Sequence, residues 1–98
     1  MLEVIGPKRL RVFKALGNEK RARIINAIIE LTANGEKPTF EKVRTKAGLG
    51  IGDMGYHLKI LKSAGLVEST ENGYVVSPVV FDLAEALFKH ELKIREGV

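Results

Sequence analysis

The stretch that decides the fold is residues 52–76, GDMGYHLKILKSAGLVESTENGYVV. Its first half predicts an amphipathic helix over about 52–64, and Gly65 ends that helix. Its second half predicts a β-hairpin around Asn72-Gly73, a dipeptide typical of tight turns, and we expect positive φ at both of these residues. A helix followed directly by a hairpin indicates a helix-turn-helix with a wing.

The rest of the chain supplies the helices that such a fold needs. We expect helices over residues 7–16, from Asn18 to about Ala33, from Thr39 to Ala47 and over 77–96, with strands at 66–70 and 74–76. Asn18, Thr39 and Ser77 are typical N-cap residues. The predicted fold class is α+β, mainly α: a single winged helix-turn-helix domain over residues 1–98, with its core in 7–76 and an added C-terminal helix.

Composition bounds the possible function. A chain of 98 residues that is 45% apolar and free of low-complexity segments can bury a modest core. It contains no cysteine, so it has neither disulfides nor thiolate metal sites. No apolar run is long enough for a membrane span and no secretory signal is visible, so we expect a cytoplasmic protein with no membrane partner.

The charge is unevenly spread along the chain. Residues 1–48 hold 11 Lys and Arg against 5 Asp and Glu, a net charge of +6, whereas residues 49–98 hold 5 against 7, a net of −2. A basic half favours an anionic partner such as nucleic acid, because cations beside phosphates release condensed counterions. A solvated, charge-rich surface has the same composition, so charge alone decides nothing.

The helix over 52–64 has two unlike faces at 100° per residue. The apolar face carries Met54, His57, Leu58, Ile60, Leu61 and Ala64, and the other face carries Gly52, Gly55, Tyr56, Lys59, Lys62 and Ser63. Each glycine costs a helix about 1 kcal/mol relative to alanine. We interpret the second face as a recognition surface: Gly52, Tyr56 and Lys59 meet the DNA groove, Gly55 allows close backbone approach, and Lys62 contacts phosphate. The alternative is a frayed helix start with a solvated face. His57 is expected to pack or hydrogen-bond between helices.

Two stretches resemble ArsR-like winged-helix transcription regulators. Residues 56–68, YHLKILKSAGLVE, are similar to the segment that leads from their recognition helix into the wing, and residues 15–25, ALGNEKRARII, are similar to the entry into their second helix. The resemblance covers roughly residues 10–80, and MarR-like regulators carry related strings. It implies sequence-specific binding of double-stranded DNA as a homodimer, with the first and last helices at the dimer interface.

Some residues depart from that family pattern. The last helix offers Asp82, His90 and Glu91, but a single imidazole with scattered carboxylates is a weak site, so we expect no metal and no cofactor. Asp53 lies near the start of the recognition helix, where phosphate would repel it. We expect Asp53 either to cap that helix or to accept a hydrogen bond from a cytosine amino group.

The wing is acidic. Residues 66–76 contain Glu68 and Glu71 and no Lys or Arg, although a wing that grips the minor groove needs a cation. Either the wing stays clear of DNA or the positive contacts come from elsewhere. The third helix offers Lys42, Arg44 and Lys46, which we expect to contact the DNA backbone.

The last helix is more apolar than a terminal helix of a small domain needs to be. We expect Leu83, Leu87, Phe88 and Leu92 to form a dimer interface, with help from Leu2, Val4 and Ile5. The alternative is a single apolar stripe that docks on its own domain.

Enzymatic activity has little support, since the chain has no phosphate-binding Gly-Lys-Ser/Thr loop, no metal triad and no cysteine nucleophile. No catalytic residue is therefore expected. The sequence predicts a dimeric transcription regulator that binds double-stranded DNA with the helix over 52–64 in the major groove. The alternative is a winged-helix protein–protein interaction module without specific DNA binding, which the acidic wing favours.

Overall fold

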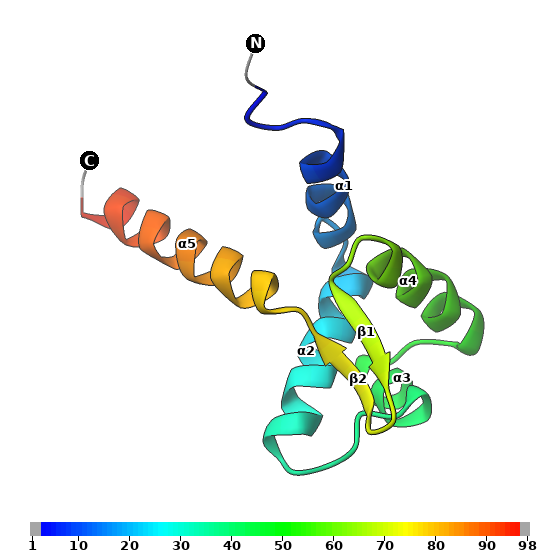
Figure 1. The fold of residues 1–98 in the computed structure, drawn as a ribbon. Coiled ribbons are helices and arrows are strands. Elements are labelled where there is room, and N and C mark those ends of the chain that lie inside the picture. Colours follow the sequence, from blue (N-terminus) through cyan, green and yellow to red (C-terminus); the bar gives the residue numbers. More distant parts are fainter. Residues whose placement is uncertain (1–2, 97–98) are drawn as a thin grey trace.

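The computed structural model describes residues 3–96 as five helices and one β-hairpin (Figure 1). In chain order these are α1 (Pro7–Leu16), α2 (Glu19–Ala33), α3 (Phe40–Ala47), α4 (Ile51–Ser63), β1 (Val67–Thr70), β2 (Gly73–Val76) and α5 (Pro78–Arg95). This order confirms the predicted fold: mainly α, with a winged helix-turn-helix layout and an added C-terminal helix. The predicted boundaries of the helices and strands hold to within about one residue.

Helix α2 is the centre of the domain, because it packs against α1, α3, α4 and β2. Its buried side chains cover a wide arc, as predicted, and include Ile24 and Ile28, which are fully enclosed. Burial of each such side chain contributes about 1.5–3 kcal/mol to folding. The core is completed by Val43 of α3, Met54, Leu58 and Leu61 of α4, and Leu66 and Val67 at the start of the hairpin.

The predicted helix caps are present. The Asn18 side chain accepts a hydrogen bond from the Arg21 backbone N–H at 3.1 Å and starts α2. Thr39 accepts from the Lys42 N–H at 3.3 Å and starts α3. Ser77 caps α5, whose first residue is proline. Each cap satisfies a backbone donor that the helix itself leaves unpaired.

The hairpin forms as predicted, but its turn differs in detail. Val67 pairs with Val76, and Thr70 pairs with Gly73. Of Asn72 and Gly73, only Gly73 has positive φ (105°), so the expectation of positive φ at Asn72 is wrong. A Cβ at Gly73 would lie 2.5 Å from the carbonyl oxygen of Pro38, which accepts a hydrogen bond from the Tyr74 N–H. Glycine is needed here because the hairpin packs closely on the loop before α3.

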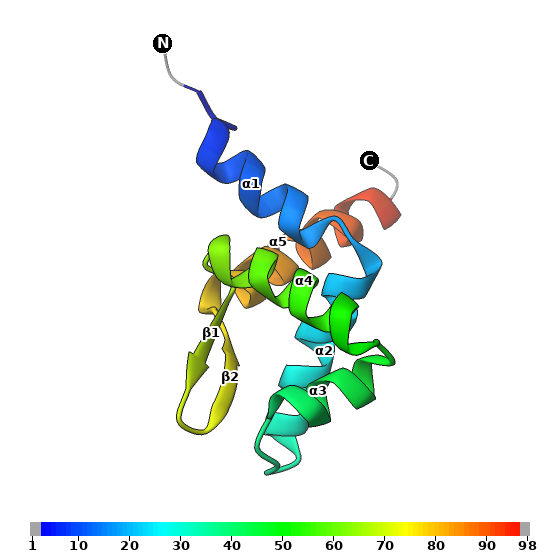
Figure 2. The same cartoon turned by 90° about the vertical axis from the view of Figure 1, so that its right-hand side faces the viewer.

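Helix α5 leaves the body of the domain and points away from α4 (Figures 1 and 2). None of its residues is buried. The radius of gyration is 15.0 Å, against about 13 Å for a compact domain of 100 residues. Only its first turns touch the core, through the half-buried Val80 and through Phe81, which borders an apolar hollow with Ile28 and Ile29. The alternative that the whole stripe docks on its own domain is therefore wrong.

Candidate nucleic-acid interface

The recognition helix predicted over 52–64 corresponds to α4. The N-cap of this helix and the role of Asp53 differ from the prediction. The N-cap is Gly50, which offers no side-chain hydrogen bond. Asp53 does not cap the helix: its Oδ2 lies 2.8 Å from Nζ of Lys20 on α2. The hydrogen bond and charge of Lys20 lower the pKa of the Asp53 carboxyl. This pair ties α4 to α2 and neutralises the one carboxylate of α4.

The inner face of α4 packs on the core as predicted. Met54 and Leu61 are fully enclosed, Leu58 is buried, and Ile60 is half-buried. This packing holds the helix at a defined angle on α2, so the position of the outer face is set by the core.

His57 makes the inter-helix hydrogen bond that was predicted for it. It is buried, and its Nδ1 lies 2.9 Å from Nη1 of Arg21 on α2. Because a guanidinium only donates, Nδ1 accepts and the ring proton sits on Nε2. The same guanidinium donates to the backbone oxygens of Ala15 (2.6 Å) and Lys14 (3.1 Å) at the end of α1. Arg21 therefore joins α1, α2 and α4.

The environment of His57 favours its neutral form. Burial lowers the pKa of the imidazole, and the charge of Arg21 lowers it further, while Asp53 opposes the shift. A neutral ring is also what the hydrogen bond from Arg21 requires. His57 is thus a structural contact beneath the outer face of α4.

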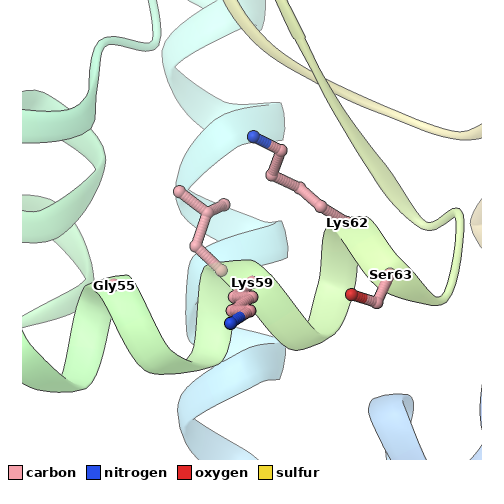
Figure 3. A pocket seen from close by; sticks show the side chains of 5 residues that line it. Gly55, Lys59, Lys62 and Ser63 are labelled. Atoms are coloured by element: carbon pink, nitrogen blue, oxygen red, sulfur yellow. The ribbon is translucent and has the colours of Figure 1, made fainter.

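The residues of the outer face of α4 are exposed. Figure 3 shows the part of this face from Gly55 to Ser63. Tyr56 has 63% of its surface exposed. Lys59 points outward from the middle of the face, and Lys62 and Ser63 diverge to its two sides. Gly55 lies with these three residues around a shallow hollow of about 390 Å³. Neither lysine forms an ion pair or a side-chain hydrogen bond with any residue in 3–96, so both charges are available to an external anion.

The two glycines of the outer face have no role inside the protein. Neither Gly52 nor Gly55 has positive φ, and a Cβ at either position would meet no heavy atom within 4 Å. Alanine would therefore fit both positions, and at Gly55, in the interior of the helix, it would stabilise the helix by about 1 kcal/mol. The packing of the domain therefore does not explain these two glycines.

The cations of α3 are arranged differently from those of α4. Nζ of Lys46 lies 3.3 Å from Oε1 of Glu30 on α2, and Nζ of Lys42 lies 3.7 Å from Oε1 of Glu36 in the loop before α3. These lysines stay partly exposed, but each already has a carboxylate partner. Lys46 thus links α3 to α2, whereas Lys42 links α3 to the loop before it.

Arg44 is also engaged within the protein. Its guanidinium pairs with Glu41 one helical turn earlier and donates to the backbone oxygen of Leu49 at 2.9 Å. The hydrogen bond to Arg44 lowers the pKa of Glu41, and the hydrogen bond to Glu41 raises the pKa of Arg44. The contact with Leu49 holds the turn between α3 and α4. Arg44 thus has a structural role that its sequence position did not indicate.

One cation near α4 was missed by the sequence reasoning. Arg11 of α1 borders a hollow of about 350 Å³ together with Tyr56, Lys59, Ile60 and Ser63 of α4. Residues 11 and 59 are far apart in the sequence, and only the packing of α1 on α4 brings them together. The sequence signal available was the run of cations in α1, which was not connected to the recognition helix.

Two further properties concern metals and membranes. Within residues 3–96, no three His, Cys, Asp or Glu side chains gather in a way that could hold a metal ion. None of the helices described here combines the length and the apolar character that crossing a bilayer requires.

The fold defines a winged helix-turn-helix domain. In this domain α4, the second helix of the helix-turn-helix, faces solvent. By sequence, the chain belongs to the family described as a domain of unknown function, DUF7347, whose model matches residues 10–87. The match spans α1 to the middle of α5 and so includes the whole helix-turn-helix and the hairpin. No curated protein and no solved structure matches the chain.

Proposed function

We propose that the protein is a transcription regulator that binds double-stranded DNA as a homodimer, with α4 in the major groove. The observation that carries the proposal is the outer face of α4. This face combines unpaired lysines, an exposed tyrosine and two glycines that the domain itself does not need. The likeness of residues 56–68 to ArsR-like regulators supports the same conclusion.

Each part of this face has a chemical use on DNA. The major groove, about 12 Å wide, admits an α-helix. Gly52 and Gly55 remove the side chains that would hold the α4 backbone away from the groove. Tyr56 and Lys59 can then reach base edges, and Lys62 can pair with a phosphate. Asp53 does not repel the phosphates, because Lys20 neutralises it.

A homodimer explains the exposed apolar side chains of α5. Leu87 and Phe88 each have 59% of their surface exposed, and Leu92 has 39%. Leu83 is half-buried, and Val4 and Ile5, before α1, are also exposed. Leu2 was predicted to help at this interface, but it lies outside the described residues. A second copy that covers α5 would bury this surface and place two α4 helices about 34 Å apart on one face of DNA.

The dimer predicts the effect of one substitution. Leu87→Asp places a charge on the exposed face of α5, so the protein becomes monomeric without loss of its fold, because Leu87 contributes nothing to the core. Light scattering measures the mass, and circular dichroism checks the helix content. A variant that keeps the mass of the wild-type dimer refutes this interface.

The function itself is tested by the binding of random-sequence duplexes, measured by fluorescence anisotropy at low and higher salt. A protein that contacts several phosphates loses affinity by orders of magnitude as salt rises. Absence of binding at low salt contradicts the proposal. The acidic hairpin would then favour the other candidate, a winged helix that docks on a protein partner.

A further inference from the structure

Helix α1 is a basic surface beside α4 that the proposed function has not used. Its ten residues include four cations and no carboxylate, and all four cations are exposed: Lys8, Arg9, Arg11 and Lys14. A helix with this composition carries a strong local positive potential. The contacts of α1 with the core come from Ala15 and from the half-buried Val12 and Leu16, and none of the four cations takes part in them.

Arg11 is the member of this set that faces the proposed DNA surface. It shares a hollow of about 350 Å³ with Tyr56, Lys59 and Ser63 of α4. It forms no ion pair and no side-chain hydrogen bond with any residue in 3–96, whereas the Arg9 guanidinium donates to the Val4 backbone oxygen at 2.6 Å. Arg11 and Lys59 are thus two unneutralised cations on either side of one hollow.

The other flank of α4 carries the opposite charge. In Figure 2, α1 lies on one side of α4 and the hairpin lies on the other. The hairpin exposes Glu68 and Glu71 and has no Lys or Arg between residues 66 and 76. A polyanion seated on α4 is therefore attracted toward α1 and repelled from the hairpin.

We propose that α1 is a second DNA-contacting element, in which Arg11 binds a backbone phosphate at the edge of the groove that α4 enters. The inference rests on the proposed function and adds a direction: the contact surface extends from α4 toward α1 and away from the wing. Arginine suits this role, because its planar guanidinium donates two parallel hydrogen bonds to a phosphate.

This role of α1 is compatible with a dimer that also uses α1. At 100° per residue, Arg11 lies about 100° from Leu10 and about 160° from Phe13 around the helix axis. Leu10 and Phe13 are the exposed apolar residues of α1, at 45% and 46% exposure. They therefore occupy a different face, which remains open to a second copy while Arg11 contacts DNA.

The test compares Arg11→Ala with Lys93→Ala by the dependence of duplex affinity on salt. Both variants lose one exposed cation, and Lys93 lies in the last turn of α5, far from α4. Loss of one phosphate contact in each protomer of the dimer reduces the slope of log affinity against log salt by about 1.8, which is about 0.9 for each contact, and weakens binding severalfold at low salt. We expect this change for Arg11→Ala, a partial recovery for Arg11→Lys, and the wild-type slope for Lys93→Ala.

The outcomes separate this inference from the function on which it rests. If the wild type shows no salt-dependent binding, the proposed function fails and the α1 contact fails with it. If the wild type binds and Lys59→Glu weakens binding, but Arg11→Ala keeps the slope of Lys93→Ala, only the α1 contact is overturned. Thermal unfolding of each variant excludes a loss of fold, which is not expected because Arg11 is exposed and forms no ion pair or side-chain hydrogen bond with any residue in 3–96.

Discussion

Helices α3 and α4 both carry exposed cations, but they use them differently. Every cation of α3 has a carboxylate partner: Lys42 with Glu36, Arg44 with Glu41 and Lys46 with Glu30. The two lysines of α4 have none among the described residues, and Arg11 of α1 borders the same hollow as one of them, Lys59. The cations of α3 are thus paired within the protein, whereas Lys59, Lys62 and Arg11 keep unneutralised charges at the surface.

The comparison shows that a count of basic residues overstates the charge available to a partner. An exposed ion pair stabilises a protein by about 0–1 kcal/mol, so the α3 pairs contribute little to folding. They still reduce the charge that a phosphate meets, since the carboxylate must be displaced or left beside it. We therefore expect Lys42, Arg44 and Lys46 to be weaker phosphate ligands than Lys59, Lys62 and Arg11, although the sequence placed the α3 cations in the binding set.

The largest effect is expected from charge reversal on each helix. Lys59→Glu should lower duplex affinity by about 10- to 100-fold, because it removes one contact and adds a repulsion inside the interface. Lys46→Glu changes the net charge by the same amount on α3 and should lower affinity by less than about threefold. Anisotropy titrations at one salt concentration give both values. Equal losses of duplex affinity for the two variants would contradict the expected difference between α3 and α4.

A second, smaller effect is expected from substitution of a glycine on the outer face of α4. Helix α3 contains no glycine. Gly55→Ala should raise the free energy of unfolding by about 1 kcal/mol, since its Cβ meets open space. The same change should lower duplex affinity severalfold, because a methyl group separates the α4 backbone from the groove. Chemical denaturation and anisotropy measure the two quantities. A more stable variant with unchanged affinity would show that DNA does not approach Gly55 closely.

The smallest effect concerns the link between α1 and α4 through Arg21. The pKa of His57 is lowered below its ordinary value of 6.5, so the unfolded chain binds a proton before the folded protein does. Stability should therefore be full above about pH 6.5 and fall as the pH drops toward the folded pKa. Protonated His57 can no longer accept from Arg21, and α3 takes no part in this contact.

The measurement is thermal unfolding between about pH 7 and about pH 5, above the range in which most carboxylates titrate. His57→Gln keeps an acceptor for Arg21 but does not titrate, so its profile should be flatter than that of the wild type. His90→Gln, on the exposed surface of α5, is the matched control and should behave as the wild type does. If the wild-type profile persists in His57→Gln, the shift does not arise at His57.

Much of the fold could be predicted because its signals are local. Asn18, Thr39 and Ser77 cap the helices that follow them, and the two faces of α4 follow from a 100° periodicity. The placement of His57 on the buried face followed from the same periodicity. These features depend on a few neighbouring residues, so one sequence is sufficient to find them.

The rest depended on contacts between distant segments. Asp53 looked like a cap, but its partner Lys20 lies 33 positions earlier, and the partner of His57 lies 36 positions earlier. The role of Arg11 follows only from the packing of α1 on α4. The need for glycine at position 73 includes the close approach of the hairpin to Pro38, a contact that the Asn-Gly signal does not contain.

The most direct test of the central claim is a map of backbone amide shifts in the wild-type protein, recorded by NMR as a random-sequence duplex is added at low salt. The account predicts that the largest changes cluster on α4, at Gly52, Gly55, Tyr56, Lys59 and Lys62, with further changes around Arg11. Lys42, Thr45 and Lys46 of α3 should change little. Changes centred on α3 or on the hairpin, with α4 unaffected, would contradict the claim that the outer face of α4 binds DNA.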